Sequence, residues 1–106
     1  MQLGKMYLVK ELFWLLFPTK EVAEAWWERG GQRSERSWAY QEAKKCSERF
    51  KCNVAVVEEN AYFVLLEQDK FYIKLLDSNG NIGWISFCFW NFSKHFEVLN
   101  ETNNNL

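Results

Sequence analysis

The sequence holds few side chains that could carry out chemistry, and the clearest pair is a thiol and an imidazole. His95 is the only histidine, and Cys88 precedes it in the chain. A Cys–His pair acts as nucleophile and general base when a third group orients the two within hydrogen-bond distance. Cys88, however, lies among Phe87, Phe89 and Trp90, and an apolar setting disfavours the reactive thiolate. We therefore expect a packed thiol, a surface imidazole and no enzyme activity.

A zinc site is the second kind of chemistry to consider. Its four ligands would have to be Cys46, Cys52, Cys88 and His95. Structural zinc sites usually take ligands in pairs roughly two to four residues apart, and this sequence has no such pair. Three cysteines without tight spacing also argue against a disulfide framework. The sequence thus predicts no metal, no cofactor and reduced thiols, as in a cytoplasmic protein.

Nucleic-acid binding is the third possibility, because arginine and tryptophan residues are interspersed between residues 26 and 49. Arginine contacts phosphates and aromatic rings stack on bases. The same stretch also contains several glutamates, and the formal net charge of the whole chain is −1. Nucleic-acid binding is therefore the alternative function. The residues that would carry it are Arg29, Arg33, Arg36 and Trp38.

Protein binding has the broadest support. Six tryptophans occur among 106 residues, and 18% of the chain is aromatic, so we expect some rings to lie outside the core and to act as interface anchors. The sequence predicts a non-catalytic adaptor or regulatory module that docks on a larger protein through an exposed aromatic patch. Self-association through the same patch, as a homodimer, is the other outcome considered. The predicted patch consists of Trp27, Tyr72, Trp84 and Trp90.

The first apolar segment, residues 6–17, does not reveal its secondary structure. Polar Lys10 and Glu11 interrupt it, and Pro18 ends it. Its Leu, Met, Lys and Glu residues favour a helix, whereas Val9 and the aromatics favour a strand. Periodicity does not decide between the two in so short a run. We favour the helix.

Two clearer helices follow. Thr19 is a plausible N-cap for a helix over residues 20–29, which Gly30 and Gly31 end. A second helix runs from about residue 37 to residue 50, with apolar residues at spacings of three and four. We expect this apolar stripe to face a sheet. Its members are Ala39, Ala43, Cys46 and Phe50.

The remaining sequence has the pattern of an antiparallel sheet. Asn79-Gly80 lies between two apolar runs, and Asn-Gly is the strongest short signal of a hairpin because both residues tolerate positive φ. β-branched and aromatic residues dominate each run. The predicted strands cover residues 53–57, 61–66, 71–76, 82–89 and 96–99.

The predicted hairpin resembles the distal hairpin of bacterial SH3-like domains. The match covers about 15 of the 106 residues. The matching positions are Tyr72, Lys74, Gly80, Gly83, Trp84 and Ile85. This resemblance implies a small β-barrel that binds peptides, peptidoglycan or other proteins and has no chemistry of its own. The N-terminal part of the family's barrel pattern is missing, and helices are predicted in its place.

The predicted fold is thus a single α+β domain over residues 1–106. Two or three helices in residues 5–50 pack on a curved antiparallel sheet of four to five strands in residues 53–99, which is an SH3-like barrel if the resemblance holds. Residues 100–106 form a flexible tail. The apolar run at residues 12–17 is far shorter than a bilayer span, so we expect no membrane association.

Overall fold

A computed structural model describes residues 3–11, 13–29, 36–86 and 92–99, without the side chains of residues 36 and 37. Within these ranges the chain forms three helices and two antiparallel sheets, which confirms the predicted α+β class. The helices are α1 (Lys20–Glu28), α2 (Arg36–Phe50) and α3 (Phe92–His95). The strands are β1 (Met6–Val9), β2 (Trp14–Leu16), β3 (Ala55–Val57), β4 (Tyr62–Gln68), β5 (Tyr72–Asp77), β6 (Ile82–Ser86) and β7 (Phe96–Val98).

The larger sheet has five strands in the order β6-β5-β4-β1-β7, and the smaller one pairs β2 with β3. β5 and β6 form the predicted hairpin. The buried Asp77 carboxylate accepts hydrogen bonds from the backbone N–H groups of Asn79 and Asn81, which fixes its turn. The larger sheet is open, with β6 and β7 at its two ends, so the expectation of an SH3-like barrel is wrong for the described strands. The strand expected at the start of this sheet, β3, pairs with β2 instead, because β1 takes the place beside β4.

The helix expected over residues 6–17 is wrong, because this segment forms β1 and β2. Tyr7 and Val9 point into the core while Met6 lies exposed on the other side, as the two-residue period of a strand requires. Each strand is too short for its period to show in the sequence. Their partners, β4 and β3, lie 39 to 58 residues further along the chain. Tertiary pairing therefore overrides local helix propensity here.

One short junction links the two sheets. The N–H of Phe17 donates to the carbonyl oxygen of Trp84 at 2.8 Å, and the N–H of Trp84 donates to that of Phe17 at 2.7 Å. Gly83 allows this approach, since a Cβ there would lie 2.5 Å from the Phe17 oxygen and 2.8 Å from Cγ of Leu16. The small sheet is thus attached to the β6 end of the large one.

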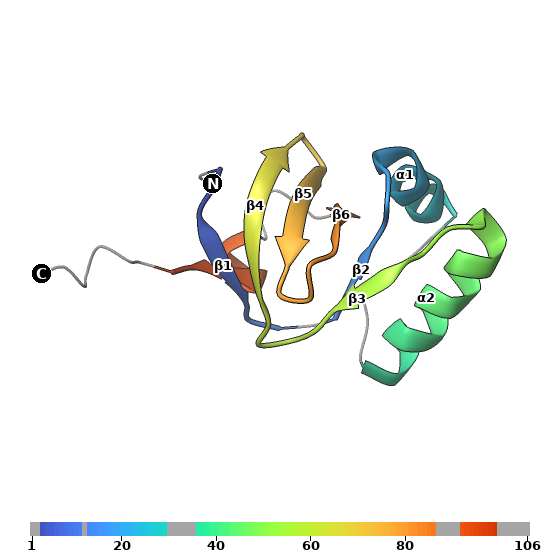
Figure 1. The fold of residues 1–106 in the computed structure, drawn as a ribbon, viewed down its shortest axis with the longest axis horizontal. Coiled ribbons are helices and arrows are strands. Elements are labelled where there is room, and N and C mark those ends of the chain that lie inside the picture. Colours follow the sequence, from blue (N-terminus) through green and yellow to red (C-terminus); the bar gives the residue numbers. More distant parts are fainter. Residues whose placement is uncertain (1–2, 12, 30–35, 87–91, 100–106) are drawn as a thin grey trace, which may run out of the picture.

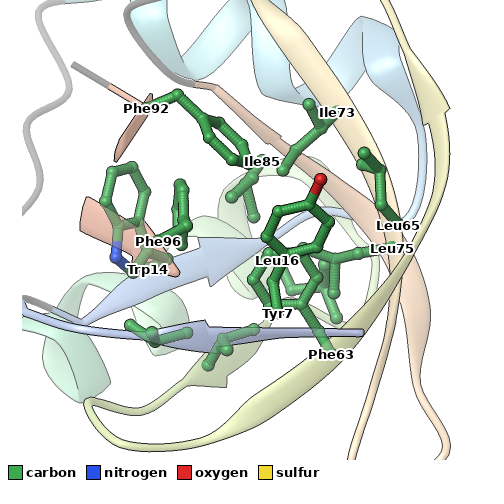
Figure 2. Packing of buried hydrophobic residues seen from close by; sticks show 12 residues of the cluster. Tyr7, Trp14, Leu16, Phe63, Leu65, Ile73, Leu75, Ile85, Phe92 and Phe96 are labelled. Atoms are coloured by element: carbon green, nitrogen blue, oxygen red, sulfur yellow. The ribbon is translucent and has the colours of Figure 1, made fainter. Parts of the chain in front are cut away.

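The two sheets together enclose the main core (Figure 2). Trp14 and Leu16 of β2 belong to the same buried cluster as Phe63 and Leu65 of β4. Aromatic rings fill much of this space: Tyr7 stacks on Phe63 with ring centroids 5.6 Å apart. The other members of the cluster are Val9, Val57, Ile73, Leu75, Ile85, Phe92 and Phe96.

A second core lies on the opposite side of β2 and β3, beneath α1 and α2. Figure 1 shows these two helices gathered beside β2 and β3, away from β1. Thr19 caps α1 as predicted, accepting from the N–H of Val22 at 3.2 Å. The indole of Trp26 donates to Glu42 at 3.0 Å, which ties α1 to α2. The predicted stripe of α2 faces this core: Ala39, Ala43 and Cys46 are buried, and Phe50 packs at its margin.

Gly83→Ala tests the junction. The added methyl group overpacks against the Phe17 carbonyl, which typically costs ~1–3 kcal/mol. Stiffening of the unfolded chain returns only about 0.4–1 kcal/mol. We expect a lower free energy of unfolding in urea. Ile82→Ala, at an exposed position of the same strand, should change that free energy by only about 0.5 kcal/mol. A Gly83→Ala protein as stable as the parent would contradict the close approach of β2 to β6.

Candidate functional site

An apolar row crosses the side of the large sheet that faces away from the main core. Met6 of β1 pairs with Val64 of β4, Val64 pairs with Leu76 of β5, and Leu76 pairs with Ile82 of β6. Residues that are neighbours in register project to the same side of a sheet. The next residue along β4, Leu65, is fully buried in the main core, so the row points outward. Four strands thus present one aliphatic side chain each at the same height.

A second pair lies beside this row, two residues further along β1. Leu8 of β1 lies opposite Tyr62 of β4. Ile82 is 56% exposed, Tyr62 46% and Met6 37%, whereas the remaining side chains are half-buried between their neighbours. We call this surface the outer face. It consists of Met6, Leu8, Tyr62, Val64, Leu76 and Ile82.

The outer face departs from the usual pattern of a solvated sheet. An antiparallel sheet with one face in water normally alternates apolar residues inside with polar residues outside. The continuous apolar sequence of β2 has a structural reason: Trp14 and Leu16 lie in the main core, and Leu15 lies in the second core. β2 is covered on both sides. None of the six outer-face residues belongs to either buried cluster of the described residues. This side of the sheet is therefore not covered by the elements that the structure describes.

Two ion pairs lie around Trp84 at the border of the outer face. Lys74 lies opposite Trp84 in register, with its ammonium 6.0 Å from the centroid of the ring. The ammonium of Lys20 lies 5.8 Å from the same ring. Lys74 pairs with Glu67 at 3.2 Å, and Lys20 pairs with Asp69. Each cation therefore has its own carboxylate, and the border is locally neutral.

The Lys20–Asp69 pair keeps both of its groups charged. The hydrogen bond to Asp69 raises the pKa of Lys20, and the hydrogen bond from Lys20 lowers the pKa of Asp69. Both side chains are partly exposed, so the pair adds little to stability. The pair therefore adds no net charge to the surface around Trp84.

The four residues of the predicted aromatic patch do not form one surface. Trp27 is 48% exposed on α1, where its ring lies 6.4 Å from that of buried Trp26. Trp84 is half-buried and packs at the margin of the second core. Tyr72 is only 9% exposed, so its ring packs in the second core and has little surface that a partner could contact. Trp90 lies outside the described residues.

The two described side chains of the predicted nucleic-acid surface belong to different helices. Arg29 is the C-cap residue of α1, with its guanidinium 5.9 Å from the ring centroid of Phe50. Trp38 is exposed near the start of α2. Arg33 and the side chain of Arg36 lie outside the described part of the chain. The structure therefore places two of the four side chains and does not join them into one site.

The surface imidazole expected at His95 is wrong. His95 is buried; its Nδ1 lies 3.1 Å from a carboxylate oxygen of Glu11, and its ring packs edge-on against Trp14 at 5.1 Å. The reason is tertiary: its carbonyl oxygen accepts from the N–H of Lys10 at 2.7 Å, which docks α3 on the β1–β2 connection. Cys88, the thiol considered with it, lies outside the described residues.

Sequence reasoning looked for large rings and missed the outer face, which is mainly aliphatic. A signal was nevertheless present in β4. Residues 62–66 read Tyr-Phe-Val-Leu-Leu without any charged residue. Such a run is typical of a strand buried on both sides. Here the described structure buries only one side, and the other carries the outer face.

Cys46 should behave as an inert thiol. Burial, followed by the nearby Glu42 carboxylate, raises its pKa to about 11. We expect no alkylation of Cys46 by iodoacetamide at neutral pH in the folded protein and rapid alkylation in urea, read by mass spectrometry of its peptide. Because its pKa is raised on folding, its contribution to stability is complete below pH ~9 and is lost as the pH rises toward 11. Alkylation of folded protein at the rate of a free thiol would contradict this environment.

No protein-family model matches the chain, and no curated protein or solved structure matches it with significance. Within the described ranges, no three His, Cys, Asp or Glu residues are grouped so that they could hold a metal ion. No helix in those ranges is long and apolar enough to cross a bilayer. The candidate site is therefore defined by the geometry of the outer face itself.

Proposed function

We propose that this chain is a non-catalytic protein-interaction module that binds another protein through its outer face. The observation that carries the proposal is the aliphatic row in register across four strands, Met6, Val64, Leu76 and Ile82. Exposed, contiguous apolar surface of this kind marks interaction sites in soluble proteins. The class of function is the one predicted from the sequence. The binding surface is the outer face of the sheet instead of the predicted aromatic patch.

Apolar burial provides the driving force for such binding. Full burial of an Ile side chain contributes roughly 1.5–3 kcal/mol. Ile82 is already 44% covered in the isolated chain, since 56% of it is exposed, so a partner would gain on the order of 1 kcal/mol there. Tyr62 adds a second anchor with a polar tip, a residue type enriched in binding hot spots. Several such terms together are needed to offset the entropy lost on association.

The resemblance of the β5–β6 hairpin to SH3-like domains supports the same class of function. Lys74, Trp84 and Ile85 stand at the positions that match that family, and the family binds peptides or proteins without catalysis. The proposed relationship to SH3-like domains rests on the sequence of this hairpin.

Ile82→Lys tests the proposed function. A buried, unpaired ammonium opposes docking, so the variant should bind at least about tenfold more weakly to a partner captured from an extract of the native host. Trp27→Lys is the matched control, because it places the same charge at a similarly exposed apolar residue on α1. The binding constants would be measured with the purified partner by titration calorimetry.

Equal unfolding midpoints for both variants would show that only the surface has changed. Weakened binding by Ile82→Lys with unchanged binding by Trp27→Lys supports the outer face. The reverse result would move the site to α1 and overturn the proposal as stated.

A further inference from the structure

We propose that the outer face binds the outer face of a second copy of this chain, forming a reversible two-fold dimer. The inference rests on the proposed function, because it names the partner of the same surface. In a two-fold dimer the same patch serves both subunits, so the patch must be complementary to itself. Charge, symmetry and area each bear on that requirement.

Charge does not oppose the approach of two copies. Five of the six outer-face residues carry no polar side-chain group, and the sixth is Tyr62. Two cations beside Trp84, Lys74 of β5 and Lys20 of α1, are already paired with Glu67 and Asp69. The formal net charge of the whole chain is −1, so long-range repulsion between copies is small.

The lack of polar groups also favours a copy over a foreign partner. Recognition of a different protein usually relies on charged or polar groups that fix the register and exclude wrong partners. The row of Met6, Val64, Leu76 and Ile82 offers none. A two-fold axis supplies the register instead, because every contact is made twice.

The border charge at β7 selects the direction of the axis. Glu97 is exposed and pairs in register with Leu8 at the β7 end of the outer face. An axis along the row would place the two β7 strands over each other and bring both Glu97 carboxylates to the same edge of the interface. An axis parallel to the strands places β7 of one copy beyond β6 of the other and separates the carboxylates. This second axis brings Met6 opposite Ile82 and Val64 opposite Leu76.

The size of the face sets the strength of the dimer. Four neighbouring strands span about 14 Å between the outer axes, and three outward residues along a strand span a similar length. The footprint is therefore a few hundred Å² per copy, below the ~800 Å² per partner of a typical stable complex. We expect a folded monomer in equilibrium with a weak dimer.

Sedimentation equilibrium of the full chain tests the dimer. From about 1 µM to about 1 mM, the range in which weak complexes form, the average mass should rise from the monomer value of 12.7 kDa toward twice that value. Ile82→Lys and Met6→Glu should each weaken the dimer at least about tenfold. A mixture of these two variants should regain dimer, because the new charges lie opposite each other across one half of the interface.

The matched control is a mixture of Ile82→Lys with Ile82→Glu, in which each new charge faces Met6. It should not regain dimer. A parent chain that stays monomeric at about 1 mM, or a dimer that Ile82→Lys leaves intact, would overturn the inference. If the parent chain is monomeric while Ile82→Lys still abolishes binding to a partner from the extract, the dimer falls and the proposed function stands. If Ile82→Lys changes neither the self-association nor the affinity for the partner, both the dimer and the proposed function are contradicted.

Discussion

The fold depends on the close backbone pairing of Phe17 with Trp84, which only a residue without a side chain at position 83 allows. Through this pair the β2–β3 ribbon continues the large sheet beyond its β6 edge. The resulting curve encloses one core on its concave side. It also presents the other side of β2 to α1 and α2, which form the second core there.

The same geometry explains why one part of the sheet is left uncovered. The two long helices follow β2 in the chain and return at β3, so they lie beside that ribbon (Figure 1). Trp84 marks the limit of their cover, half-buried between the second core and Lys74. Beyond it, the strands β1, β4 and β5 keep an apolar outward side with no described element over it. The proposed function in binding is based on this mismatch between the apolar outward side and the elements that cover the sheet.

Local chemistry predicted the parts of the fold that depend on near neighbours. Asn79-Gly80 indicated the hairpin, and Thr19 indicated the start of α1. The strands β1 and β2 could not be predicted in the same way, because each is short and finds its partner far along the chain. The outer face was missed for a related reason: its row is assembled from four strands, and only their register brings Met6 and Ile82 onto one line.

The central claim is that the apolar outer side around Val64, Leu76 and Ile82 is open to water in the single chain. Methyl NMR spectra with a soluble paramagnetic probe measure this directly. In dilute protein, the probe should broaden the methyl signals of Val64, Leu76 and Ile82 and leave those of Leu65, Leu75 and Ile85 sharp. Equal protection of both sets in dilute protein would show that the chain itself covers this surface, and would contradict the claim.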